Sequence, residues 1–392
     1  MALTLTVPSG AFHLSGNPIW VKITGASAPA GSTNYKVLCK VTSTDGVLIG
    51  GPFIDSKVPG TTETWFDVSG YVDQPIEKTF QWPLVGEMTG HADDTLNVTY
   101  TAGETYIDSN GDLQENWEAT GVVDFVLKGG VGYRKLGQYN DDSSSFYADY
   151  VTGAKFLTNL PDNQKVNPYQ PIKLWFVAAA NYNANLVIKA YYEDGTTYTR
   201  TNQAGFYIDI IHEMDIMPYH NDNVNLAPVI NGVKMTRFEF QISGKTAKQT
   251  YYIDHSYHEQ CNYLFFLNSF GGVDCVWLSG EVQKGFKSDA VQALKPFAIE
   301  GSAKDRTMIV SSRTGQCTWK INSGWKSQLE IEALKDLLLS KQVWLLEDAS
   351  GYNQGTLHPV TIENSSSDLY NSQEDLFSLD LEITEAHNNQ YL

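Results

Sequence analysis

Two short apolar runs, Tyr263–Leu267 and Val273–Leu278, constrain the fold of this chain most strongly. Both are rich in aromatic and β-branched residues, which favours strands over helices at this length. Between them lies Asn268-Ser-Phe-Gly-Gly272, whose glycine pair supplies the positive φ of a tight reversal. The stretch therefore predicts a β-hairpin. We interpret it as a joint between N-terminal domains and a C-terminal domain, because the sequence pattern changes there.

Residues 1–250 alternate short strand patterns with turn clusters, which is typical of antiparallel β-sandwiches. In Tyr35–Val41, apolar residues alternate with lysines, as expected for a strand with one buried face. Asn110-Gly111 separates two strand patterns and favours a hairpin with a type I′ turn. We expect one sandwich domain in residues 1–130, a linker or exposed loop in residues 131–153, and a second sandwich in residues 154–250.

Residues 251–392 predict a small α+β domain. Ser327 and Glu330 have the spacing of a capping box, and the helix should run to about Ser340 with one apolar stripe formed by Ile331, Leu334, Leu337 and Leu338. Before the helix, a strand hairpin is expected to turn at Arg313–Gly315. After it, Leu376–Thr384 alternates cleanly between apolar and polar residues. The predicted fold is mainly β: two antiparallel β-sandwich-like domains, then a β-sandwich with one helix.

Charge and cysteine content exclude several functions. The chain has 45 acidic and 27 basic residues, a net charge of −18, and it has no cluster of Lys or Arg. Sequence-specific nucleic-acid binding is therefore not expected, and anionic membranes should repel the chain. The longest apolar run, Leu174–Ala180, is too short to insert into a membrane. Four cysteines without a Cys-x-x-Cys motif, after a start without a signal-peptide pattern, favour synthesis and folding in a cytoplasm.

The densest group of possible metal ligands is Asp254-His255-Ser-Tyr-His258-Glu259. The segment is flanked by strand patterns, in which residues three apart point to opposite faces, so convergence on one metal is not expected. Asp108–Asp112 resembles the start of a calcium loop, but its glycine is at the fourth position and Ala119 stands where the closing acid should be. We predict neither a metal nor another cofactor.

The sequence also offers no residues for catalysis. The pairs Asp93-Asp94 and Asp141-Asp142 are expected to be solvated, and His212-Glu213 and His220 are interpreted as polar positions at strand ends. Nucleophile elbows and phosphate-binding glycine loops are not found. The chain is therefore predicted not to be an enzyme.

A family resemblance rests on the C-terminal third. The blocks Phe266–Asp274, Ser323–Trp344, His358–Ile362 and Asp375–Ile383 together resemble a module in virion structural proteins of tailed phages and prophages of Bacteroidetes-type hosts. The resemblance implies a tail-tube or distal-tail fold whose copies form rings. It also implies a tail-tip or baseplate component, made in the host cytoplasm and located in the virion, whose partners are its own copies and other tail proteins.

For such an assembly, eight residues around the joint, the helix and the last strands are predicted to take part in contacts with a neighbouring copy: Phe270, Gly271, Gly272, Trp277, Leu334, Leu338, Trp344 and Phe377.

The alternative function is that of a carbohydrate-binding adhesin or receptor-binding module, which would add host-surface glycans to the partners. Exposed tryptophans can stack on sugar rings, whereas tryptophans of a sandwich core cannot. Five tryptophans are available in the two sandwiches, and the sequence favours core positions for them because aromatic residues dominate sandwich cores: Trp20, Trp65, Trp82, Trp117 and Trp175.

Overall fold

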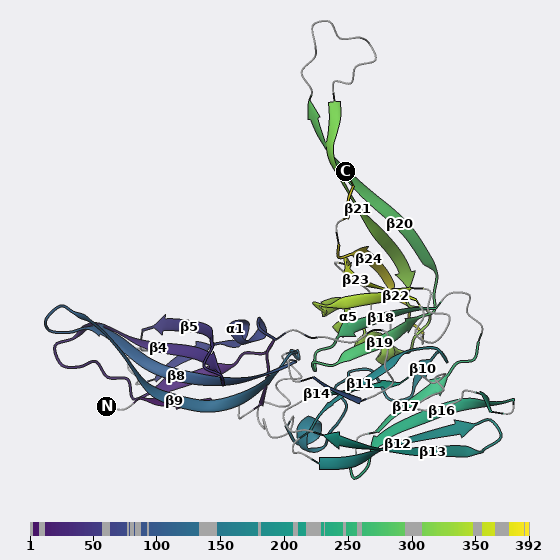
Figure 1. The fold of residues 1–392 in the computed structure, drawn as a ribbon, viewed down its shortest axis with the longest axis horizontal. Helices are drawn as coiled ribbons and strands as arrows, with labels where there is room; N and C mark the ends of the chain where they lie inside the picture. The colour runs from purple at the N-terminus through teal and green to yellow at the C-terminus, as the bar shows by residue number, and fades with distance from the viewer. Residues whose placement is uncertain are drawn as a thin grey trace, which may run out of the picture.

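The computed structural model of the chain describes residues 3–7, 12–56, 63–76, 78, 82, 88–91, 94–132, 147–178, 182–206, 211–216, 229–230, 232–245, 248–256, 261–294, 308–347, 355–364, 376–387 and 389–391. The chain is mainly β, as predicted, and its strands form five sheets in the described residues. Figure 1 shows an elongated N-terminal unit, a body built from the middle and the end of the chain, and a long hairpin that projects from the body.

The N-terminal unit is a sandwich of two sheets. The first has the order β1-β3-β6 and consists of β1 (Thr4–Thr6), β3 (Trp20–Thr24) and β6 (Glu63–Asp67). The second has the order β2-β9-β8-β4-β5 and consists of β2 (Phe12–Leu14), β9 (Leu113–Leu127), β8 (Thr95–Ile107), β4 (Thr33–Ser43) and β5 (Leu48–Asp55). Their inner faces and the short helix α1 (Ser69–Asp73) share one buried core.

The turn between β8 and β9 differs from the prediction. A type I′ turn requires positive φ at both central residues, but of Asn110 and Gly111 only Gly111 has one, at 88°. The Asp108 carboxylate accepts hydrogen bonds from the backbone N–H groups of Asn110 (2.9 Å) and Asp112 (3.0 Å). This side chain therefore organises a longer loop and removes the need for the predicted two-residue turn.

The second unit also consists of two facing sheets. The larger has the order β10-β17-β16-β12-β13, made of β10 (Gln164–Val166), β17 (Lys248–Ile253), β16 (Val233–Ile242), β12 (Tyr182–Tyr192) and β13 (Thr197–Phe206), and β15 (Val229–Ile230) pairs with β16. The smaller has the order β11-β14-β7, made of β11 (Ile172–Val177), β14 (Ile211–Ile216) and β7 (Met88–His91). Strand β7 precedes residue 130 in the chain, so the boundary predicted there does not separate the two units.

Two strand pairs are parallel, β2 with β9 and β10 with β17. Every other pairing between the described strands is antiparallel.

The predicted linker contains the π-helix η1 (Tyr147–Thr152). This helix packs against the predicted turn at residues 268–272, since the Tyr150 ring stacks on Phe270 with ring centroids 4.8 Å apart.

The C-terminal unit is built on an eight-stranded sheet. Its order is β19-β18-β22-β23-β24-β21-β20, made of β19 (Val273–Leu278), β18 (Asn262–Leu267), β22 (Val343–Glu347), β23 (Thr356–Ile362), β24 (Asp380–Glu385), β21 (Met308–Asn322) and β20 (Val282–Leu294), and β25 (Asn389–Tyr391) pairs with β21. The predicted alternation at the C-terminal end is confirmed from Phe377 to Ile383, because Phe377, Leu379, Leu381 and Ile383 are buried and the polar residues between them are exposed, whereas Thr384 is buried.

The predicted capping box is present: the backbone N–H of Ser327 donates to the Glu330 carboxylate (2.9 Å), and the Glu330 N–H donates to Ser327 Oγ (3.4 Å). The single predicted helix is nevertheless two short ones, α4 (Gln328–Ala333) and α5 (Lys335–Leu339). Leu334 lies between them with ψ of −7°, and its N–H is shared between the carbonyls of Glu330 and Ile331, so the turn tightens there. None of the described helices is long and apolar enough to cross a membrane.

The predicted turn at Arg313–Gly315 is wrong. These residues lie inside β21, which pairs with β20 over the length of both strands, with Ser288 opposite Gly315. The glycine serves packing instead: a Cβ at this position would lie 2.2 Å from Cζ of the Phe286 ring. We name the paired strands β20 and β21 the arm, and Figure 1 shows the arm extending well beyond the body.

Candidate functional site

The hairpin β18–β19, which we name the joint together with its turn at residues 268–272, is buried on both faces. All of the residues in its two strands are buried. One face, including Tyr263, Phe265 and Trp277, belongs to a core shared with the N-terminal unit and the smaller sheet of the second unit. The other face, including Leu264 and Phe266, belongs to the core of the C-terminal unit. The joint therefore links all three units.

The eight residues predicted for contacts between copies lie in these two cores or at their edges. Phe270 and Trp277 are buried in the first core, and Leu334 and Phe377 in the second. Trp344 and Leu338 are partly buried and pack against the first and second core, respectively. The structure thus divides these residues between two cores of one chain, and their role between copies stays a prediction.

Close backbone contact at the turn of the joint explains its glycines. Gly271 has φ of 84°, and a Cβ there would lie 1.9 Å from the carbonyl oxygen of Lys128. A Cβ on Gly272 would lie 2.3 Å from the carbonyl oxygen of Leu157. The N–H of Gly130 donates to the Ser269 carbonyl at 2.8 Å. The end of the N-terminal unit therefore rests directly on this turn, and any side chain at Gly271 would push the two apart.

Asn268 holds the turn in shape. Its side-chain oxygen accepts hydrogen bonds from the backbone N–H groups of Phe270 (2.9 Å) and Gly272 (3.0 Å). Its amide nitrogen donates to the Leu157 carbonyl (2.7 Å) and to the Asp274 carboxylate (2.9 Å). Because these four bonds use the full capacity of a buried amide, Asn268 fixes the turn and ties it to the second unit.

Asp274 is a buried acid beside this turn. Burial, helped by the nearby charge of Asp336, raises its pKa from 3.8 to about 7, although hydrogen bonds from Thr158 and Asn268 act to lower it. Asp336 lies on α5 and accepts hydrogen bonds from the Ser269 N–H (3.0 Å) and from the Asn159 side chain. The carboxyl group of Asp274 therefore changes its charge near neutral pH inside the joint.

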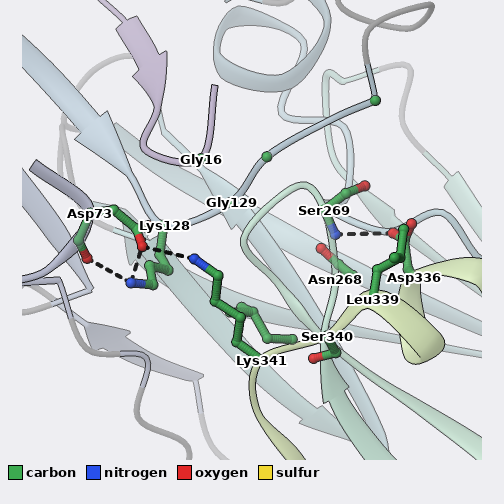
Figure 2. A pocket seen from close by; sticks show the side chains of 13 residues that line it. Gly16, Asp73, Lys128, Gly129, Asn268, Ser269, Asp336, Leu339, Ser340 and Lys341 are labelled. Carbon is green, nitrogen blue, oxygen red and sulfur yellow. Dashed lines mark hydrogen bonds and ion pairs between the residues drawn. The ribbon is translucent and has the colours of Figure 1, made fainter. Parts of the chain in front are cut away.

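A cavity of about 240 Å³ lies between the N-terminal and the C-terminal unit. Figure 2 shows Asp73 at one side, with Lys128 and Lys341 pointing toward it, and the turn of the joint at the other. Asp73 forms ion pairs of 3.1 Å with each lysine and accepts a hydrogen bond from Ser15 Oγ (2.6 Å). Burial would raise the pKa of Asp73, but these three partners hold it below its usual value. Lys341 thereby connects the C-terminal unit with the N-terminal one.

Charged groups are buried between β7, β14 and β11. Glu213 contacts Lys173 and lies 2.5 Å from His91 Nε2, and Lys78 lies 2.7 Å from Asp94. Burial acts to raise the pKa of Glu213, but His91 and Lys173 lower it more strongly. Burial also lowers the pKa of Lys78, although Asp94 opposes this. The carboxylates and ammonium groups compensate each other and hold β7 on the second unit.

Two sequence interpretations are therefore wrong. Asp94 is fully buried, where solvation was expected, and Glu213 is buried inside a strand, where a strand end was expected. The sequence contains one indication of these buried charges. Lys173 interrupts the apolar run Pro171–Val177, and a lysine buried in such a strand needs a buried partner. Asp93, Asp141, Asp142, His220, His258 and Glu259 lie outside the described residues. Among those described, no three His, Cys, Asp or Glu side chains converge as metal ligands.

The arm carries apolar side chains into solvent. The register places Phe286, Ala290 and Leu294 on one face together with Met308 and Val310 of the partner strand. Closer to the body, the same face carries Trp319 and Ile321, which belong to the core of the C-terminal unit. Leu294 is 81% exposed, and Phe286, Met308 and Val310 are at least half exposed. Ser288, Gln292 and Arg313 lie on this face too, so its exposed apolar side chains form a cluster of Leu294, Met308 and Val310 at the far end of the described arm, with Phe286 closer to the body.

The five tryptophans named for sugar binding divide between core and surface. Trp175 is buried, and Trp82 and Trp117 are partly buried. Trp20 and Trp65 are 46% and 39% exposed.

Comparison with family models finds no family that matches the chain, and its sequence matches no curated protein.

Gly271→Ala should destabilise the chain by more than about 3 kcal/mol, because the left-handed backbone costs about 1–2 kcal/mol and the clash with Lys128 adds to it. Gly195→Ala is the matched control, since Gly195 has φ of 82° in a hairpin turn and nothing lies near its Cβ position. Denaturant unfolding of both variants gives the comparison. Equal losses would contradict the role assigned to the backbone contact.

Asp274→Asn should alter how stability depends on pH. The folded chain keeps the Asp274 proton up to about pH 7, whereas the unfolded chain loses it near pH 4, so this group lowers stability as pH rises between these values. The asparagine variant lacks this loss. Its unfolding free energy relative to wild type should therefore increase from about pH 4 to about pH 8. A difference that stays constant with pH would contradict the prediction.

Glu213→Gln should cost about 3–5 kcal/mol of stability, because it leaves the buried Lys173 ammonium without this carboxylate. Glu382→Gln is a control with the same chemical change, in the exposed 2.7 Å pair with Lys320. Solvent screens that pair, so its loss should be far smaller. Thermal unfolding of both variants at neutral pH gives the comparison. Similar losses of stability would show that the buried network stabilises the fold no more than an exposed ion pair does.

Proposed function

We propose that the chain is a non-enzymatic virion structural protein whose copies associate into a ring at the tail tip or baseplate. In this role it connects the tail tube with host-facing parts of the particle. The resemblance of residues 250–392 to tailed-phage virion proteins supports the proposal, and so does the form of the arm.

The observation that carries the proposal is the exposed apolar face of the arm. Leu294, Met308 and Val310 adjoin one another there and are all at least half exposed, and such a cluster of large apolar side chains marks an interaction site. In the described sheet β20 is also the terminal strand, so its outer edge offers backbone groups for pairing with another chain. Both features lie on the same projecting element, which favours docking onto a second protein over binding of a small molecule.

The proposed occupant of this surface is the body of a neighbouring copy. An arm that docks on a different surface of the next copy makes a head-to-tail contact, and such contacts generate rings when the rotation between copies closes. Closure requires that arm and body keep a constant angle. At its base the arm supplies Trp319 and Ile321 to the core of the C-terminal unit, so packing fixes that angle. The net charge of −18 keeps unassembled copies soluble.

Lysine substitutions on the arm test the proposal. Leu294→Lys and Val310→Lys should each weaken self-association at least about tenfold, because each removes a large apolar group from the interface and places a charge there. The measurement is size-exclusion chromatography with light scattering over a range of concentrations, followed by negative-stain imaging.

Ser312→Lys is the control, since Ser312 is exposed on the opposite face of the arm, where it pairs with Val291. It should assemble as wild type does. Wild-type protein that remains monomeric at every concentration would refute self-association, and equal assembly of all three variants would show that the apolar face is not the contact.

A further inference from the structure

The outer face of the sheet β1-β3-β6 presents two exposed tryptophans. In the register of β3 and β6, Trp20 pairs with Asp67 and Lys22 pairs with Trp65. Residues two apart on one strand share a face, so Trp20 and Trp65 lie on the same side of the sheet as diagonal neighbours. Their exposed fractions are 46% and 39%. We name this face, with Lys22, Glu63 and the nearby threonines, the platform.

The platform is rigid because its reverse side is core. Val21, Ile23 and Phe66 alternate with the exposed residues and are buried in the sandwich. Strand β3 is hydrogen-bonded on both sides, to β1 and to β6. The two indole rings therefore project from a fixed backbone, and a ligand would lose little free energy in ordering them.

Polar groups lie between and beside the rings. Lys22 Nζ is 2.6 Å from Glu63 Oε1 and 5.1 Å from the centre of the Trp65 ring. The side chains of Lys22 and Glu63 remain 25% and 40% exposed. Thr4 and Thr6 add exposed residues with hydroxyl groups on the neighbouring strand. The face thus combines two flat apolar surfaces with hydrogen-bond donors and acceptors.

We propose that the platform binds a linear oligosaccharide, with a sugar ring stacked on each indole. A sugar ring has an apolar face of C–H groups and a rim of hydroxyls. Indole faces are large, apolar and electron-rich, and so complement the C–H face. Lys22 and Glu63 can exchange hydrogen bonds with the hydroxyls, which both donate and accept.

Other ligand classes fit this surface less well. The chain has a net charge of −18 and Glu63 lies on the platform, so nucleic acids and other polyanions are disfavoured. A protein partner would need a contiguous apolar centre, but here the Lys22–Glu63 ion pair lies beside the Trp65 ring.

The test uses the full chain on an array of linear oligosaccharides. Titration calorimetry follows with hexamers of β-linked glucose, β-linked N-acetylglucosamine and α-linked glucose. Trp20→Ala and Trp65→Ala should each lower the affinity for the glycans bound by wild type at least about tenfold. Trp65→Phe should lose less, because a smaller aromatic face remains. Both alanine variants should remain folded, since neither indole belongs to the buried core of the sandwich, and their melting temperatures check this.

Trp325→Ala is the matched control, because Trp325 is 71% exposed in the C-terminal unit, away from the platform. It should bind as wild type does. Failure of wild type to bind any glycan on the array or in the panel would overturn the inference, as would binding that survives loss of both platform tryptophans. The outcome is independent of ring formation: platform variants should assemble normally, and Leu294→Lys should bind sugar as monomer.

Discussion

Burial of the joint on both faces is the interaction on which the rest of the structure depends. Most strands have one polar face, and a shift of register by one residue would expose their apolar side chains. In β18 and β19 both faces are apolar, so this pattern alone cannot select the register. Asn268 does so instead, because its four hydrogen bonds form only with Phe270, Gly272, Asp274 and the Leu157 carbonyl in their observed places. One amide thereby sets which side chains enter which core.

Polar groups inside the molecule have a related role at β7. This strand is connected in sequence to the N-terminal unit but pairs with β14 of the second. Its His91 meets Glu213, which also compensates the buried Lys173. A buried ion pair contributes little net stability compared with apolar packing, yet it penalises alternatives that leave a charge unpaired. We interpret the network as a specificity device: β7 docked in another register would separate His91 from Glu213.

The sequence predicted elements whose signals are local, and it failed where the cause is distant. The capping box at Ser327 and the alternation after Leu376 depend on neighbours in sequence, and both are present. Gly315 looked like a turn residue, because nothing nearby in the sequence reveals that Phe286 needs the space above it. Likewise, no local pattern distinguishes the exposed Trp65 from the buried Trp175, since both lie in strands and only the facing sheet decides their exposure.

The joint also gives the two proposed activities a common geometry. Figure 1 shows the N-terminal unit and the arm leaving the body in different directions, so a ligand on one would not obstruct the other. Because the glycine contact and the shared core fix the N-terminal unit, every copy in a ring would present its platform at the same angle. Weak sugar binding at each site then gains from the high local concentration of the remaining sites, provided that one glycan surface reaches several of them. A rigid joint therefore improves binding by an assembled particle more than binding by a single chain. We take this as the reason why the turn of the joint contains glycines at positions that tolerate no side chain.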